Sequence, residues 1–380
     1  MIEMRSPIVM ERQQLFDVGS VLTMQIVIRP KATFEQLRQA FESACHCHEI
    51  FSSRIELDAS GKAYYTDCDH PQNSFSQTEL SLQELIRENE RIRFRLEKGE
   101  FLRGFDAPSG VVFMLHHLGE DGKSLLYLIE TFLNCLSGKE PAFLPFHCLR
   151  EENLPRRSGL SLPYRITMKM LNRMWRRDKQ VFTLDDLDRS FATLWKNRQT
   201  SLSVSRYDRK ALDQLLKQSK EAKVSLTSWL LTDMVRAQPD QKASFGLSAT
   251  HRVSGNRAMG NYSTGIIARF RYRPRKSFEQ NAKRMQRLIH RRLQNVKALY
   301  MPLHAVAMLD TTLPDAMNFE HTGIFHSRAS GLAAYMAGYG KKVRTMSVSN
   351  LLRSDIPLTY GPYHLENLIF IPPVVSYEKT

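Results

Sequence analysis

The residues best suited to chemistry lie in one run, His116-His117-Leu118-Gly119-Glu120-Asp121-Gly122. An imidazole with an ordinary pKa of about 6.5 can accept a proton near neutral pH, so a histidine here could act as a general base. The carboxylate of Asp121 would be stabilised at a helix N-terminus, and it could also fix the turn through a salt bridge. The alternative is a pair of structural histidines beside an ordinary Asp-Gly turn.

The flanking segments predict how this run is positioned. Residues Gly110–His116 are almost all apolar, which is typical of a buried strand, and Asp121–Leu136 carries a broad apolar stripe at helical spacing. Neighbouring side chains on a strand point to opposite faces. We therefore expect one histidine to face a cleft and the other to pack inward.

The apolar period alternates between two and 3.6 along the chain, which predicts a mixed α/β protein. In the first half we expect a helix at Thr33–Ala44 and a hairpin at 51–66. A basic helix at Tyr164–Arg177 should follow. In the second half we expect strands at Ser201–Ser205, Phe245–Arg252, Thr264–Tyr272, Met346–Asn350 and Leu368–Ile371, and helices at Asp208–Ala222, Ser225–Ala237 and Lys276–Ala298.

A length of 380 residues favours two domains over one. The Pro- and Gly-rich stretch 137–165 is the best boundary. We expect an N-terminal subdomain over 1–150, a crossover linker over 151–198 and a C-terminal subdomain over 199–380.

The motif His116-His117-x-x-x-Asp121-Gly122 resembles the His-His-x-x-x-Asp-Gly signature of the thioester-dependent acyltransferase superfamily. This superfamily includes chloramphenicol acetyltransferase, condensation domains of non-ribosomal peptide synthetases and alcohol acetyltransferases. Further segments resemble the family pattern along most of the chain: Cys47–Arg54, Leu96–Arg103, Thr250–Arg252, Gly260–Tyr262 and Ser349–Arg353.

The resemblance implies an α/β pseudo-dimer of two chloramphenicol-acetyltransferase-like domains with a tunnel between them. By that analogy His117 is the general base and His116 packs inward, while Gly122 permits close backbone approach. Asp121 is structural in the family and pairs with an arginine, for which Arg252 is our candidate. Ser349 and Asn350 are the expected substrate-binding residues.

The resemblance also implies the substrates. The donor is expected to be acyl-coenzyme A or an acyl group on the phosphopantetheine arm of a carrier protein, and the acceptor a small-molecule amine or alcohol. The thioester is a co-substrate, so no permanently bound cofactor is expected. A pseudo-dimer already builds the tunnel within one chain, so we expect a monomer.

The chain carries a net charge of +15, which implies attraction to an anionic partner. The phosphates of coenzyme A or an acidic carrier protein would satisfy it. No recognised nucleic-acid motif accompanies the charge, so we expect no nucleic-acid partner. Arg173, Arg176, Arg177 and Lys179 around Trp175 could form a helix on a membrane surface, but we expect them to decorate the crossover linker.

The cysteines do not form a disulfide scaffold, because their number is odd (Cys45, Cys47, Cys68, Cys135 and Cys148). The run Cys45-His46-Cys47-His48 suggests zinc, but alternating ligands at a helix end are poorly placed for one tetrahedral ion. We expect no metal site. Reduced thiols and the absence of a long apolar run or leader-like start favour a cytoplasmic protein.

These observations favour an acyltransferase in specialised-metabolite or lipid biosynthesis. A free-standing condensation enzyme that forms amide bonds is the close variant. A non-catalytic recruitment protein of the same fold is the second hypothesis, which a blocked tunnel at His117 would favour. A basic protein that binds nucleic acid or anionic membranes is the third, and it predicts binding that depends steeply on salt.

Overall fold

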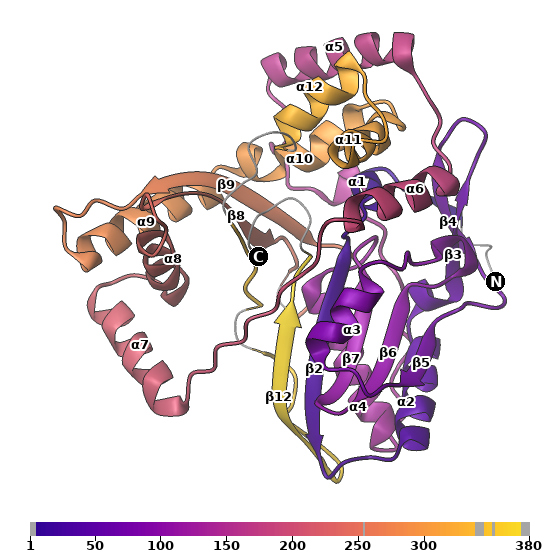
Figure 1. Ribbon diagram of the computed structural model, residues 1–380, viewed down its shortest axis with the longest axis vertical. Coiled ribbons are helices and arrows are strands. Elements are labelled where there is room, and N and C mark those ends of the chain that lie inside the picture. The colour runs from indigo at the N-terminus through magenta and orange to yellow at the C-terminus, as the bar shows by residue number, and fades with distance from the viewer. Residues whose placement is uncertain (1–4, 254, 339–345, 352–353, 374–380) are drawn as a thin grey trace.

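The computed structural model describes residues 5–253, 255–338, 346–351 and 354–373. Within these residues the strands form three sheets, and helices cover them (Figure 1). The strands are β1 Arg5–Pro7, β2 Val21–Arg29, β3 Ser53–Leu57, β4 Ala63–Asp67, β5 Ser74–Gln77, β6 Leu102–Ala107, β7 Gly110–His116, β8 Lys242–Thr250, β9 Ser263–Arg271, β10 Met346–Val348, β11 Thr359–Tyr360 and β12 Tyr363–Ile371.

The helices cluster in three regions of the chain. The first region holds α1 Arg12–Leu15, α2 Phe34–His46, α3 Leu82–Asn89 and α4 Gly122–Leu136. The middle region holds α5 Leu162–Asp178, α6 Leu184–Trp195, α7 Arg209–Glu221 and α8 Leu226–Arg236. The last region holds α9 Phe278–Gln294, α10 Val296–Met308, α11 Leu313–Thr322 and α12 Arg328–Ala337.

The largest sheet has the strand order β11-β12-β2-β7-β6-β5 and carries the motif strand β7 at its centre. Strand β7 is buried almost along its whole length because helices cover both faces. Phe113 packs against rings of α2 and α4, whereas Met114 faces a pocket shared with α3 and Trp195. Central strands enclosed in this way place the residues at their ends in fixed positions.

Strand β12 joins this sheet from the far end of the chain. It pairs antiparallel with β2 from His364 opposite Arg29 to Ile371 opposite Thr23 (Figure 1). Strands β11 and β12 therefore add residues 359–371 to the sheet of the first part. The boundaries at 150 and 198 stay predictions.

The second half carries a smaller sheet with the order β10-β8-β9. Apolar side chains of α8 and α9 pack on one of its faces, among them Leu231, Val235, Met285 and Ile289. The prediction of a strand at Ser201–Ser205 is wrong. These residues form a connection that pairs with no strand in the described part of the chain. The helix expected at Lys276–Ala298 is interrupted at Asn295, which ends α9 and caps α10. The other expected helices and strands are present with shifted ends, so the prediction of a mixed α/β protein is confirmed.

Helices α5, α10, α11 and α12 form a group at one end of the molecule, at the top of Figure 1. In the part of the chain described above, none of the helices is long and apolar enough to cross a bilayer. Trp175 lies among the cations of α5 in the sequence, but its side chain is fully buried on the inner face of α5 and packs edge-on against Phe325.

Candidate active site

The two histidines of the motif leave the sheet at the end of β7. His116 pairs with Val21 of β2, and the backbone N–H of His117 donates to the Ser20 carbonyl at 2.7 Å. The neighbouring strand therefore fixes the backbone of both histidines. A turn then leads to Asp121, where α4 begins.

The ring of His117 is fixed by the turn that follows it. Its Nδ1 donates a hydrogen bond to the backbone carbonyl oxygen of Glu120. Since a carbonyl can only accept, the proton of the neutral imidazole lies on Nδ1 and the lone pair on Nε2. Burial lowers the pKa of His117, which keeps the imidazole neutral and able to accept a proton.

His116 lies in a different environment. Its Nδ1 accepts a hydrogen bond from the backbone N–H of Leu118 at 3.1 Å, and its ring meets Phe94 edge-on with centroids 5.7 Å apart. Burial lowers the pKa of His116 to about 3. His116 is therefore a neutral, packed side chain on the inner side of the strand.

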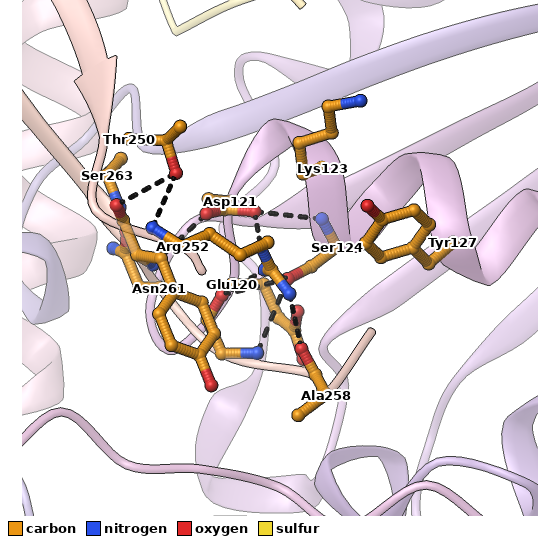
Figure 2. A network of polar contacts seen from close by, with 12 residues as sticks. Glu120, Asp121, Lys123, Ser124, Tyr127, Thr250, Arg252, Ala258, Asn261 and Ser263 are labelled. Carbon is orange, nitrogen blue, oxygen red and sulfur yellow. Dashed lines mark hydrogen bonds and ion pairs between the residues drawn. The ribbon is translucent and has the colours of Figure 1, made fainter. Parts of the chain in front are cut away.

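Asp121 is the N-cap of α4 and also joins the two halves of the chain (Figure 2). Its Oδ1 accepts from the backbone N–H of Ser124 at 2.8 Å and from Nη2 of Arg252 at 3.0 Å. Its Oδ2 accepts from the backbone N–H of Tyr262 at 3.1 Å. The carboxylate is thus occupied by structural contacts and is not directed to a substrate.

Arg252 lies at the centre of this network. Its guanidinium also donates to the Ser124 hydroxyl at 2.7 Å and to the Ala258 carbonyl at 2.6 Å, and it stacks over the Tyr262 ring (Figure 2). The side chains of Arg252 and Asp121 are both about 95% buried. Arg252 therefore holds the 250–262 loop against the start of α4.

Two glycines allow the turn after His117 and the close packing at the start of α4. Gly119 has φ +80°, a left-handed conformation that glycine adopts without strain, and a Cβ there would lie 2.7 Å from the Tyr65 hydroxyl. A Cβ at Gly122 would lie 2.9 Å from both Leu351 and Phe370. The segment after Asn350 and strand β12 thus approach the start of α4 closely.

Ser349 and Asn350 follow β10 in the second half. Nδ2 of Asn350 donates to the Thr227 hydroxyl of α8 at 3.1 Å, and Asn350 is exposed, whereas Ser349 is half-buried. A substrate-binding role for these two residues stays a prediction. In contrast, the segment Gly260–Tyr262 contacts the motif directly, because Nδ2 of Asn261 lies 3.3 Å from the His117 carbonyl oxygen.

The second half also contains an apolar cavity of about 520 Å³. It lies between one face of β8 and β9 and helices α5, α10 and α12, and Gln13 of α1 lines its wall. The next residue, Gln14, accepts a hydrogen bond from Asn261 at 2.9 Å. The cavity and the motif are therefore linked through α1 and Asn261. A tunnel that runs through to His117 stays a prediction.

Sequence reasoning missed a group of buried acids beside the motif. Glu120 is fully buried, and desolvation raises its pKa well above the usual range. Glu11 accepts a hydrogen bond from the Tyr65 hydroxyl at 2.9 Å, and burial raises its pKa to about 7. One feature of the sequence could have pointed to Glu120: it is a charged residue in the short turn between the motif histidines and Asp121.

The side chains of Cys45-His46-Cys47-His48, the run that suggested zinc, lie in different environments. His48 is fully buried with its ring edge-on to Phe51, while His46 is exposed at the end of α2, where its Nδ1 donates a hydrogen bond to the backbone carbonyl oxygen of Glu42 at 2.7 Å. Among the residues that the structure describes, no three His, Cys, Asp or Glu side chains are arranged to hold a metal ion.

Sequence comparison identifies no relative: neither a family model nor a curated protein matches the chain. Solved structures match it over nearly its whole length. Polyketide synthase associated protein 5 from Mycobacterium tuberculosis is 13% identical, with a TM-score of 0.55, covering 99% of this chain and 90% of that one. The first condensation domain of the CDA synthetase is 12% identical, with a TM-score of 0.58, covering 100% and 89%.

The condensation domain of the monacolin K polyketide synthase is similar at 12% identity, with a TM-score of 0.53 and coverage of 98% and 87%. This chain has the condensation-domain fold. The expected resemblance to that fold is therefore confirmed. At these identities the likeness concerns the architecture, and the chemistry has to be argued from the residues of the site.

Proposed function

We propose that the protein is an acyltransferase that moves an acyl group from a thioester to an amine or hydroxyl acceptor, with His117 as general base. The observation that carries the proposal is the hydrogen bond from His117 Nδ1 to the Glu120 carbonyl. It leaves Nε2 as the unprotonated nitrogen of the residue that directly follows strand β7. The lowered pKa of His117 supports the same role, because the base must be neutral to act.

The proposed reaction needs only one proton carrier. Nε2 takes the proton from the acceptor N–H or O–H as the acceptor atom attacks the thioester carbonyl carbon. The tetrahedral intermediate carries its negative charge on the former carbonyl oxygen. When it collapses, the C–S bond breaks, and the leaving thiolate takes the proton from the imidazolium of His117. The products are an amide or ester and a free thiol, and the base is regenerated.

Three features around His117 support this assignment. The motif's Asp121 is held by Arg252 and the backbone of Tyr262, so the turn that orients His117 is rigid. His116 is packed and carries its proton on Nε2, so it does not compete as a base. The apolar cavity beside α1 offers a volume of about 520 Å³ for an acyl chain or an apolar acceptor.

The test is donor-dependent thiol release. Purified protein would be incubated with a panel of acyl-coenzyme A donors and an acyl-loaded carrier protein, together with pooled amines and alcohols. We expect acceptor-dependent release of free thiol that His117→Ala lowers by roughly 100- to 10,000-fold, the usual scale for loss of a general base. His46→Ala, which removes an exposed histidine at the end of α2, should react at the normal rate.

Two results would count against the proposal. A His117→Ala variant that transfers acyl groups at the normal rate would show that His117 is not the base. No thiol release with any donor, from protein shown to be folded, would favour the non-catalytic member of the fold.

A further inference from the structure

The outer face of α5 exposes apolar side chains in a regular row. Leu162, Ile166 and Met170 are spaced four residues apart and therefore lie on one side of the helix. They are 70%, 59% and 45% exposed. The opposite side of α5 is buried through Met168, Leu171 and Trp175. Helix α5 thus has two apolar faces, of which one packs on the protein and the other faces solvent.

Helix α12 extends this exposed apolar surface. Tyr335 is 76% exposed and Met336 is exposed too, both at the C-terminal end of α12. Helices α5 and α12 lie side by side at the top of Figure 1. Met336 and Tyr164 line the same cavity, so this end of α12 lies next to the first turn of α5. We define the α5–α12 patch as Leu162, Tyr164, Ile166, Met170, Tyr335 and Met336.

Cationic side chains surround the α5 part of the patch. Arg165 and Lys169 flank the apolar row, and Arg173, Arg176 and Arg177 continue the outer face toward the end of the helix; all five are exposed. Asp178 is the one acid in α5. A helix with an apolar stripe bordered by Lys and Arg is the arrangement that binds in the interface of anionic membranes.

Two residues of the patch also border the apolar cavity. Tyr164 and Met336 are exposed to solvent and at the same time line the cavity. Behind them the wall is apolar, with Met301, Ala305 and Val306 from α10. A surface that covers the patch therefore also covers the side of the cavity bordered by Tyr164 and Met336.

We propose that the α5–α12 patch docks on the surface of an anionic lipid bilayer. The cationic side chains would meet lipid phosphates, and the exposed apolar side chains would reach the acyl-chain boundary. An acidic carrier protein would match the cations but offers no apolar phase for six exposed apolar side chains. If the proposed acyl transfer is correct, docking would place the Tyr164 and Met336 side of the cavity against lipid, so that a lipid-borne substrate could pass directly into it; this last step alone rests on the proposed function.

The test is vesicle binding by the full chain, measured by co-sedimentation. Vesicles of phosphatidylcholine alone would be compared with an equimolar mixture of phosphatidylcholine and phosphatidylglycerol. We expect binding to the anionic vesicles that weakens as salt is added, because salt screens the cationic contacts. The double variant Ile166→Glu/Met170→Glu should lower the apparent vesicle affinity by at least about tenfold, since it removes apolar contact area.

Matched controls are available on other surfaces. Ile92→Glu changes an isoleucine that is 57% exposed in a turn away from the patch and should bind as the unmodified protein does. For the cations, Lys169→Glu/Arg173→Glu should weaken binding to anionic vesicles. Lys210→Glu/Lys217→Glu on α7, at the opposite end of Figure 1, makes the same charge change and should weaken it less.

The outcomes separate this proposal from the proposed function. His117→Ala should bind vesicles normally. Vesicle binding therefore tests the docking proposal even if the protein transfers no acyl groups. The docking proposal is overturned if the unmodified chain binds neither kind of vesicle, or if Ile166→Glu/Met170→Glu binds as well as Ile92→Glu. Binding to an acyl carrier protein through the patch, without vesicle binding, would assign the surface to a protein partner instead.

Discussion

Arg12 and Asp315, 303 positions apart in the sequence, form a doubly hydrogen-bonded ion pair in the interior. Nε of Arg12 lies 2.7 Å from Oδ1 of Asp315, and Nη2 lies 2.5 Å from Oδ2. The side chains are 2% and 0% exposed. The pair attaches α1 to α11, and α1 carries Gln13 at the cavity and Gln14 beside Asn261. The geometry of the candidate site therefore depends on this contact.

Removing one partner of the pair should be strongly destabilising. Asp315→Ala leaves the guanidinium of Arg12 buried without its counter-ion, which typically costs about 3–5 kcal/mol in the free energy of unfolding. Arg12→Met/Asp315→Leu removes both charges and should recover much of that loss. Urea unfolding measures both. Arg54→Ala breaks the exposed pair with Glu56 and should cost no more than about 1 kcal/mol. An Asp315→Ala variant as stable as Arg54→Ala would contradict the prediction.

The pair of Asp121 and Arg252 should show energetic coupling. Each side chain shares partners with the other at the start of α4, so the second substitution should cost less once the first is made. We expect Asp121→Ala and Arg252→Ala each to destabilise the fold, with a coupling of at least about 1 kcal/mol in a double-mutant cycle. Thermal and urea unfolding of the four proteins would measure it. Strictly additive losses would show that the contact does not hold the loop to α4.

Local signals in the sequence were sufficient for the motif segment. The apolar run of β7, the turn glycines and the N-cap aspartate act within a few residues of one another, and the strand, turn and helix form where expected. Contacts between segments that are far apart in the sequence could not be predicted from such local signals. The pairing of Arg252 with Asp121 was expected from the family resemblance alone, and the Arg12–Asp315 pair was not expected at all.

The misassigned segments have physical explanations. Ser201–Ser205 alternates like a strand, but alternation does not specify a partner strand, and none pairs with it. In α5 the basic residues were correctly placed on a helix, yet the interior side chosen by the fold contains Trp175. The exposed apolar side of α5 consists of Leu162, Ile166 and Met170, on the side of the helix opposite the tryptophan.

The pH dependence of acyl transfer should report His117. The neutral imidazole is the active form, and burial lowers its pKa below the ordinary histidine value. Activity is therefore expected to be full at neutral pH and to persist below about pH 6.5, where an exposed histidine base would already be protonated. The measurement is kcat/KM for thiol release as a function of pH. A decline that sets in above pH 7 as the pH falls would be inconsistent with this base.

The buried carboxyl of Glu11 should make stability depend on pH. Its pKa is about 7 in the folded chain against 4.5 in the unfolded one, because burial disfavours the charge. The folded state thus holds the proton more tightly. Stability contributed by the neutral carboxyl is fully present below pH 4.5 and is lost as the pH rises toward 7.

Glu11→Gln removes the titrating group and keeps an oxygen that can accept from the Tyr65 hydroxyl. The variant should therefore be more stable than the unmodified protein at about pH 8, by up to about 3 kcal/mol, and closer to it at about pH 5. Glu221→Gln makes the same charge change on the exposed end of α7 and should shift stability by less than about 0.5 kcal/mol at either pH. Urea unfolding at the two pH values measures the difference. A gain for Glu11→Gln that is equally large at both would show that titration of this carboxyl is not its source.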